Sequence, residues 1–245
     1  MYSWVDGRII FSDEATFPVS DRGFLLGDGV FDSLLISDGV PQYLARHIKR
    51  LTDNIDRMGI PPPPELSELG RIIDELALQS DVKGGRASVR TTITRGSGPR
   101  GLAAPDEAAP RLFVSLSVLP EKRALLPLRM IVSKTVRRNE FSPLSYIKSL
   151  NYGDEVLAMR EARQKNKDNA ILLNTAGHVA CATNGNFYLL KQGHWITPPL
   201  KDGVLNGTIR EVLLNDGLIR EDIIYAQDLP QITAAAYSNS LQGIV

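Results

Sequence analysis

Ser145-Tyr-Ile-Lys-Ser-Leu-Asn-Tyr152 places one lysine, Lys148, directly after an aromatic and a β-branched residue. The segment is typical of a strand that enters a core, where burial disfavours the ammonium form and lowers the pKa of a lysine. A neutral amine can form a Schiff base with a carbonyl compound. The alternative is an ordinary lysine whose stem covers apolar surface while its charge reaches water. Lys148 is therefore a candidate nucleophile that needs support from the rest of the chain.

The composition is that of an ordinary globular protein. Of 245 residues, 43% are hydrophobic and 23% are charged, which suits one large domain or two modest ones. Lys+Arg 28 and Asp+Glu 28 balance, so nothing favours a nucleic-acid partner or an anionic membrane surface. No apolar stretch approaches a membrane span and no signal peptide is evident, so we expect a cytoplasmic protein. One cysteine, Cys181, and three scattered histidines predict no internal disulfide and no metal site.

Hairpins and helices alternate along the chain. We predict helices at 47–58, 65–79, 151–164 and 206–214, from the spacing of apolar residues and the flanking glycines and prolines. We predict strands at 3–5, 8–11, 30–36, 41–44, 87–94, 111–118, 128–134, 146–148, 170–173, 178–181, 186–190, 194–197, 223–226 and 234–238. The hairpins are too frequent for a doubly wound parallel sheet, so the fold class is mixed α and β (α+β).

The charged, proline-containing stretch after the strand at 111–118 marks a domain boundary. We expect an N-terminal α/β domain at 1–119, a linker at 120–126 and a C-terminal domain at 127–245. The chain ends at Ile244-Val245 in what reads as an unfinished strand, which suggests a longer protein.

Three further segments carry groups suited to anions. Leu205-Asn-Gly-Thr-Ile-Arg210 places small residues at a helix start, where backbone N–H groups can bind a phosphate; a capped helix is the alternative. Arg50 could bind the same anion, or be an exposed helix arginine. The glycine-rich loop Thr94–Gly101 could present Arg100 to a carboxylate, or form a plain turn. No catalytic triad, paired-carboxylate motif or nucleotide-binding glycine fingerprint accompanies them.

Together these segments resemble the class IV aminotransferases, the fold type IV pyridoxal-phosphate enzymes. The matching segments occur in the expected order and are Asp21–Phe31, His47–Leu51, Thr94–Gly101, Ile147–Tyr152, Asn186 and Asn206–Arg210. The family includes branched-chain and D-amino-acid transaminases and aminodeoxychorismate lyase. The resemblance covers essentially the whole chain. It implies a small N-terminal α/β domain, a larger C-terminal cofactor-binding domain with a mixed or antiparallel sheet, pyridoxal 5'-phosphate between them, and a homodimer.

The resemblance also implies a role for each matched residue. Lys148 would form the Schiff base with the cofactor and later carry the proton at the substrate carbon. Tyr152 would approach the phenolate oxygen, and Leu205 would pack beneath the pyridine ring. The cofactor phosphate would be held by a set of residues at the helix start and elsewhere: Arg50, Gly207, Thr208, Ile209 and Ser240. In the D-amino-acid branch, the arginine that matches Arg100 binds the substrate carboxylate from the partner subunit.

Three positions depart from the family pattern. The glutamate that normally pairs with the pyridine nitrogen falls on Cys181, and a thiol is a poor partner for a pyridinium. Carbanion stabilisation should therefore weaken, unless a neighbour substitutes; a buried, inert cysteine is the other interpretation. The D-amino-acid branch has a tyrosine and a histidine in its substrate site where this chain has Phe31 and Leu102. Strict D-amino-acid specificity is therefore not expected.

Two activities fit these residues. The first is transfer of an amino group between a small amino acid and a 2-oxo acid, because residues 147–162 resemble short bacterial transaminases. The second is aminodeoxychorismate lyase, which eliminates pyruvate to leave 4-aminobenzoate; Arg95–Gly101 and Asn239–Leu241 resemble that branch. Aromatisation would drive this elimination and make Cys181 more tolerable. A catalytically idle cofactor-binding homologue is a third possibility, against which the intact Lys148 argues.

Overall fold

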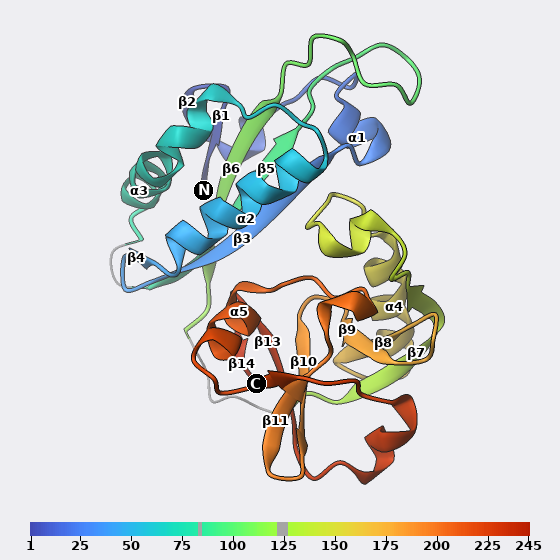
Figure 1. Cartoon of the computed structure of the whole chain (residues 1–245). Coiled ribbons are helices and arrows are strands. Elements are labelled where there is room, and N and C mark those ends of the chain that lie inside the picture. Colours follow the sequence, from blue (N-terminus) through green and yellow to red (C-terminus); the bar gives the residue numbers. More distant parts are fainter. Residues whose placement is uncertain (83–84, 122–126) are drawn as a thin grey trace. The chain divides into compact units, whose positions relative to one another are not determined.

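The computed structural model describes residues 1–82, 85–121 and 127–245, which divide into two compact units (Figure 1). The first unit is Met1–Arg123 with Lys148–Leu150, and the second is Ala124–Ile147 with Asn151–Val245. The segment around Lys148 therefore belongs to the first unit, although both of its flanks belong to the second. Most of the linker expected at 120–126 lies outside the described residues.

A six-stranded antiparallel sheet forms the framework of the first unit, in the order β2-β1-β6-β5-β3-β4 (Figure 1). Side chains alternate between its two faces, as the period of a strand requires. The strands are β1 (Tyr2–Val5), β2 (Arg8–Phe11), β3 (Gly29–Ser37), β4 (Val40–Pro41), β5 (Arg86–Thr94) and β6 (Arg111–Leu119).

Two helices pack on this sheet. Helix α2 (Leu44–Arg57) contacts β3, and helix α3 (Leu69–Gln79) contacts β1 and β6. Each buries residues three or four positions apart, because those positions share one helix face. Leu51 and Ile55 do so on α2, and Ile72 and Leu76 do so on α3. A five-residue helix, α1 (Arg22–Leu26), precedes β3 and is capped by the side chain of Asp21.

Two predicted boundaries in this unit are wrong. The strand expected at 41–44 ends at Pro41, because Tyr43 has a left-handed backbone (φ 54°) and Leu44 already begins α2. The helix expected at 65–79 begins with a 3-10 segment, Pro64–Glu68, before α3 starts at Leu69.

Lys148–Leu150 runs along the edge of β3. The N–H of Phe31 donates to the carbonyl of Lys148 (2.9 Å), and the N–H of Leu150 donates to the carbonyl of Gly29 (3.0 Å). The strand expected at 146–148 is therefore wrong. Pro143–Tyr146 forms a 3-10 turn, and the antiparallel bridge joins Ser149 to Val30.

Two smaller sheets form the second unit (Figure 1). One has the order β12-β11-β10-β13-β14 and the other β7-β8-β9. Their strands are β7 (Met130–Arg138), β8 (Asn169–Asn174), β9 (Val179–Ala182), β10 (Asn186–Lys191), β11 (His194–Thr197), β12 (Arg220–Glu221), β13 (Ala235–Asn239) and β14 (Gly243–Ile244). The two sheets share a core that contains Ile171, Val179, Phe187 and Ile196.

Helix α4 (Gly153–Gln164) packs on β7 and β8, and helix α5 (Thr208–Asn215) contacts β13. The buried residues of α4 in the core are Ala158 and Ala162, whose small side chains permit a close approach to Val136, Ala170 and Leu172.

The strand expected at 223–226 is wrong, since β12 comprises only Arg220–Glu221. Ile224 is buried and accepts a hydrogen bond from the N–H of Val179 (2.8 Å), and Tyr225 forms an isolated bridge with His178. Residues 223–226 are apolar because Ile224 is buried, although the segment does not pair continuously with a neighbouring strand.

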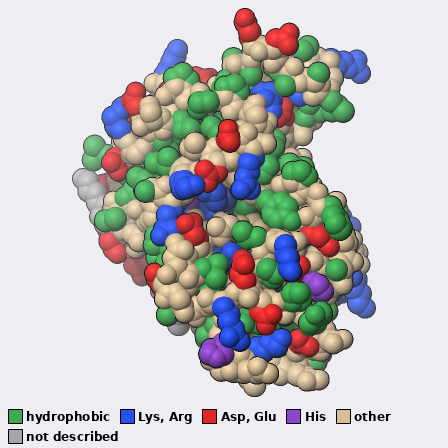
Figure 2. Space-filling view, in the orientation of Figure 1, with side chains coloured by type: hydrophobic (Ala, Val, Ile, Leu, Met, Phe, Trp, Pro, Cys, Tyr) green, Lys and Arg blue, Asp and Glu red, His purple; other side chains and the backbone are tan. Residues whose placement is uncertain are grey.

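The predicted mixed α and β fold class is confirmed by these sheets and helices. Within the described ranges, no helix is long and apolar enough to cross a membrane. Basic and acidic side chains are interspersed on the face drawn in Figure 2, as the balanced composition predicts.

The carboxylate of Glu161 should stabilise the second unit in a pH-dependent way. A hydrogen bond from Lys165 is the main cause that lowers its pKa to about 2, and burial, which opposes this, is outweighed by bonds from Ser133, Thr135 and the N–H of Lys134. The stabilisation is complete above the ordinary carboxyl pKa and is lost as pH falls through 2.

Glu161→Gln should therefore lower the free energy of unfolding by about 1–3 kcal/mol near pH 7. The difference from the unmodified protein should shrink towards pH 2, as measured by urea denaturation across pH. The exposed Glu107→Gln is the control and should show no such difference. A pH-independent effect of Glu161→Gln would contradict the expectation.

Candidate functional site

Lys148 lies over the aromatic ring of Phe31 on β3. Its Nζ is 4.4 Å from the ring centroid, and the Cζ of Arg90, on β5, is 3.7 Å from the same centroid. The residue is half-buried, and the bond from the N–H of Phe31 to its carbonyl fixes its backbone. The structure thus holds an amine beside an apolar ring and near a guanidinium. Arg90 is not among the site residues expected from the sequence, because its place beside Phe31 depends on strand pairing that the sequence does not reveal.

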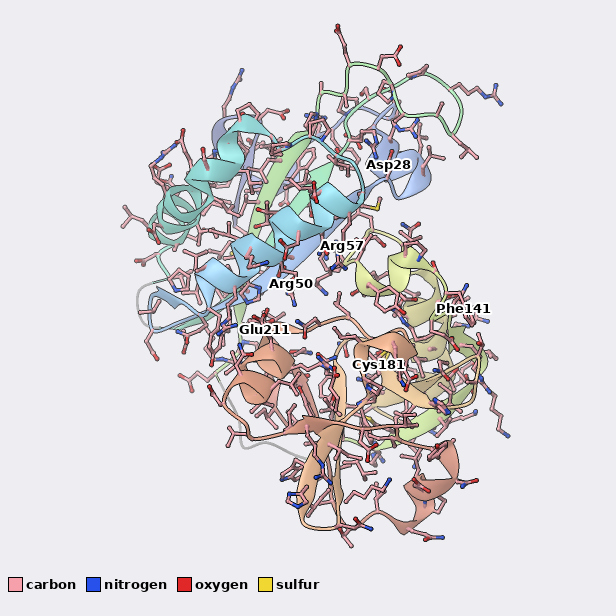
Figure 3. All side chains as sticks on the ribbon, in the orientation of Figure 1. Asp28, Arg50, Arg57, Phe141, Cys181 and Glu211 are labelled. Atoms are coloured by element: carbon pink, nitrogen blue, oxygen red, sulfur yellow. The ribbon has the colours of Figure 1, made fainter. Side chains whose placement is uncertain are left out.

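Arg50 projects from α2 (Figure 3). It forms a two-point ion pair with Asp32 on β3. Its Nε donates to Oδ2 and its Nη2 to Oδ1, both at 2.8 Å. Nδ1 of the buried His47 lies 2.7 Å from the same Oδ1. Burial disfavours the Asp32 anion, but the charge of Arg50 and the hydrogen bonds outweigh it and hold the pKa of Asp32 well below its usual range. Asp32 and His47 were not singled out from the sequence.

The loop after β5 is held by a second carboxylate, Asp28, which is labelled in Figure 3. Asp28 accepts hydrogen bonds from Arg22 and Arg95 (both 2.8 Å). Arg22 also donates to the carbonyls of Gly101 and Leu102 (3.1 and 3.0 Å), which anchors the loop. Arg100 and Leu102 themselves are exposed, Leu102 to 85%. Their contact with a substrate stays a prediction.

In the second unit, the start of α5 has the features of an anion site. Gly207 is the N-cap of the helix and, as a glycine, offers no side chain to cap the first turn. The first N–H groups of a helix have no partner within it, so Thr208 and Ile209 are suited to bind an anion. A Cβ at Gly207 would lie 2.1 Å from Oδ1 of Asn186, so any larger residue there would displace the buried Asn186 side chain.

The segment before α5 is fixed from both sides. Nδ2 of Asn186 donates to the carbonyl of Leu205 (2.9 Å), and the buried Arg210 donates to Oδ1 of Asn206 (3.0 Å). Arg210 also pairs with Glu221. Ser240 is half-buried in the turn after β13, a strand that α5 contacts.

Cys181 lies on β9, opposite Leu172, and packs against the core beneath α4 (Figure 3). Burial raises the pKa of its thiol to about 11, with Arg138 opposing the shift and Glu155 adding to it. The side chain is therefore a neutral thiol at physiological pH. Tyr152 precedes α4 and is half-buried.

Glu155, in the first turn of α4, is a buried carboxylate in this region. Its Oε1 accepts from Nη1 of Arg138 (2.6 Å), whereas its buried Oε2 has no hydrogen-bond partner among the described residues. Arg138 is itself held by the carbonyls of Gly203 (3.1 Å) and Ser145 (2.7 Å).

The predicted site residues divide between the two units. The first unit holds Phe31, Arg50, Arg100, Leu102 and Lys148, and the second holds Tyr152, Cys181, Leu205, Gly207, Thr208, Ile209 and Ser240. An amine, a fixed guanidinium and a helix start without a side-chain cap are the groups that an aldehyde-bearing phosphate ester requires, so the residues fit pyridoxal 5'-phosphate. In 1–82, 85–121 and 127–245, no cluster of histidine, cysteine and acidic residues could hold a metal ion.

Comparison with known proteins agrees with this chemistry. A family model described as "Amino-transferase class IV" matches residues 29–245. The chain is 31% identical to a Methanocaldococcus jannaschii protein with the provisional name branched-chain-amino-acid aminotransferase, over 94% of this chain and 78% of that protein. It is 29% identical to the aminodeoxychorismate lyase of Bacillus subtilis, over 87% of this chain and 72% of that enzyme.

The fold also agrees. A branched-chain aminotransferase of Thermoproteus uzoniensis superposes with a TM-score of 0.90 at 24% identity, covering 100% of this chain and 85% of the other. The predicted fold type IV architecture is thereby confirmed. Members of this family are pyridoxal-phosphate-dependent aminotransferases and aminodeoxychorismate lyases. The chain belongs to the class IV aminotransferase family.

Proposed function

We propose that the protein is a class IV aminotransferase that moves an amino group between a small amino acid and a 2-oxo acid. The observation that carries the proposal is the lysine of the 148–150 segment, held over Phe31 with its backbone bonded to β3. When bound, pyridoxal 5'-phosphate supplies a carbonyl for covalent attachment and an electron sink for the substrate carbon. Lys148 supplies the attacking amine and then carries the proton to and from that carbon.

The resemblance to the family assigns a role to each residue of the proposed cofactor site. Arg50 and the N–H groups of Thr208 and Ile209 hold the phosphate, with Gly207 giving the close approach and Ser240 adding a hydroxyl. Leu205 would pack against the pyridine ring of the cofactor, and Tyr152 would hydrogen-bond its phenolate oxygen. The fixed ion pair of Arg50 and the tight packing at Gly207 support these roles.

Aminodeoxychorismate lyase activity is the alternative. The neutral thiol of Cys181 favours it, because a reaction driven by aromatisation needs less stabilisation of a carbanion than transamination does. The relative from Bacillus subtilis bears that name. Release of pyruvate from aminodeoxychorismate without an added amino acceptor would separate lyase from transaminase.

We also propose that the protein works as a homodimer in which Arg100 binds the substrate carboxylate in the partner's site. Helix α1 supports this, because it buries the charged Arg22 and exposes Phe24, Leu25 and Leu26 to 63%, 59% and 42%. Val19, nearby in the chain, is 79% exposed. Apolar side chains grouped in this way are typical of a surface that another subunit covers.

Lys148→Ala should abolish covalent attachment of the cofactor. The unmodified protein mixed with pyridoxal 5'-phosphate should absorb in the visible range, and borohydride should bleach it and leave a stable adduct on Lys148. The variant should do neither, because it lacks the amine that attacks the cofactor carbonyl. A reducible chromophore that persists in the variant would overturn the assignment.

Cys181→Glu should raise transaminase turnover, because a carboxylate keeps a pyridine nitrogen protonated better than a neutral thiol does. Steady-state rates with a panel of D- and L-amino donors measure this. Cys181→Ser is the control, since it changes polarity without adding charge. An unchanged rate in the glutamate variant would show that another group already serves the ring.

Leu25→Glu in α1 should weaken self-association, because it places a charge in the proposed subunit contact. Sedimentation velocity should give the mass of two chains for the unmodified protein and that of one chain for the variant. Leu78→Glu, at an exposed residue of α3, is the control and should remain dimeric. A monomeric unmodified protein would contradict the proposal.

A further inference from the structure

We propose that Asp32 is a positioning residue that holds the Arg50 guanidinium in the orientation needed to bind a phosphate-bearing ligand. The inference rests on the proposed function, in which Arg50 belongs to the phosphate site, and adds the group that makes Arg50 effective. Asp32 itself would touch neither phosphate nor substrate.

The geometry of the ion pair fixes the plane of the guanidinium. Two parallel hydrogen bonds of 2.8 Å join Nε and Nη2 of Arg50 to the two carboxylate oxygens of Asp32. One bond would leave the side chain free to swing, whereas two define its plane and direction. The Asp32 pairing occupies the Nε side, so the Nη1 side of the guanidinium is the one directed away from the carboxylate.

The carboxylate is itself held rigidly. Asp32 lies on β3, where its neighbours Phe31 and Ser33 are in continuous register with β5. Nδ1 of His47, which lies three residues before Arg50 on α2, is 2.7 Å from Oδ1. The ion pair therefore joins α2 to β3 at the residue next to Phe31, whose ring lies under the amine of Lys148.

Asp32 is more deeply buried than Arg50, as expected of a residue that holds the arginine from behind without touching the ligand. The Asp32 side chain is 5% exposed and that of Arg50 is 14% exposed. A pair formed only to solubilise a helix surface would resemble Lys49 and Asp53 on the same helix, whose side chains are 72% and 50% exposed. Because Asp32 stays ionised well below neutral pH, its hold on Arg50 does not change across the physiological range.

The experiment compares two ligands that differ only in the phosphate. Dissociation constants of pyridoxal 5'-phosphate and of pyridoxal are measured by fluorescence quenching for the unmodified protein, Asp32→Asn, Arg50→Met and the double variant. Asp53→Asn, in the exposed pair on α2, is the matched control. Thermal unfolding is recorded for each protein, and Arg50→Lys provides a second route that keeps the charge but loses the two-point pairing.

We expect Asp32→Asn to weaken the binding of pyridoxal 5'-phosphate about tenfold to a hundredfold, as for other residues that orient a ligand-binding side chain. The affinity for pyridoxal should not change. Arg50→Lys should show the same phosphate-specific loss. The double variant should lose little more than Arg50→Met alone, because Asp32 acts through Arg50. Asp53→Asn should match the unmodified protein.

The inference would be overturned if Asp32→Asn weakened the binding of both ligands equally. It would also be overturned if the losses of affinity added fully in the double variant. Asp32 would then only stabilise the fold. Unchanged phosphate affinity in Arg50→Lys would overturn the inference as well. Failure of the proposed function is separately visible, because the unmodified protein would then form no borohydride-stable adduct on Lys148.

Discussion

The site depends on two backbone hydrogen bonds, which join Lys148 and Leu150 to Phe31 and Gly29 on β3. They fix the lysine in register with the strand that carries the ring beneath it. A side chain with four rotatable bonds loses much conformational freedom when it is ordered, and a fixed backbone reduces what remains to be ordered. The segments on either side of Lys148–Leu150 belong to the second unit, so these bonds also fix the point at which the chain re-enters the first unit.

Two carboxylates near the start of β3, the half-buried Asp28 and the buried Asp32, pair with the arginines of the first unit. Asp28 binds Arg22 and Arg95, and Asp32 binds Arg50 and His47. Burial alone would raise the pKa of each carboxyl group, yet both pKa values are lowered because the arginines outweigh it. Removing one member of such a pair leaves an uncompensated charge, which is costly in a protein interior. The carboxylates thus orient the loop after β5 and the guanidinium on α2.

Much of the fold followed from local patterns in the sequence. The turn at Asp6-Gly7 and the apolar spacing on α2 predicted a hairpin and a helix that the structure contains. The errors arose where tertiary contacts decide. Ile223–Ala226 is apolar because Ile224 is buried, and Tyr43 starts a helix with a left-handed backbone that no propensity signals. Lys148 and Arg50 could be chosen from motifs, but Asp32, His47 and Arg90 could not, because strand register and helix docking bring them to the site.

The alternation of side chains along β3 limits how the strand that carries the candidate site can change. Phe31 and Asp32 are consecutive, so they point to opposite sides of the sheet, one towards the lysine and the other towards α2. Deleting a single amino acid within this strand would exchange the two sides and would bury the ring where the carboxylate belongs. In related proteins, we therefore expect this strand to vary by substitution, with insertions and deletions confined to the loops that connect the strands.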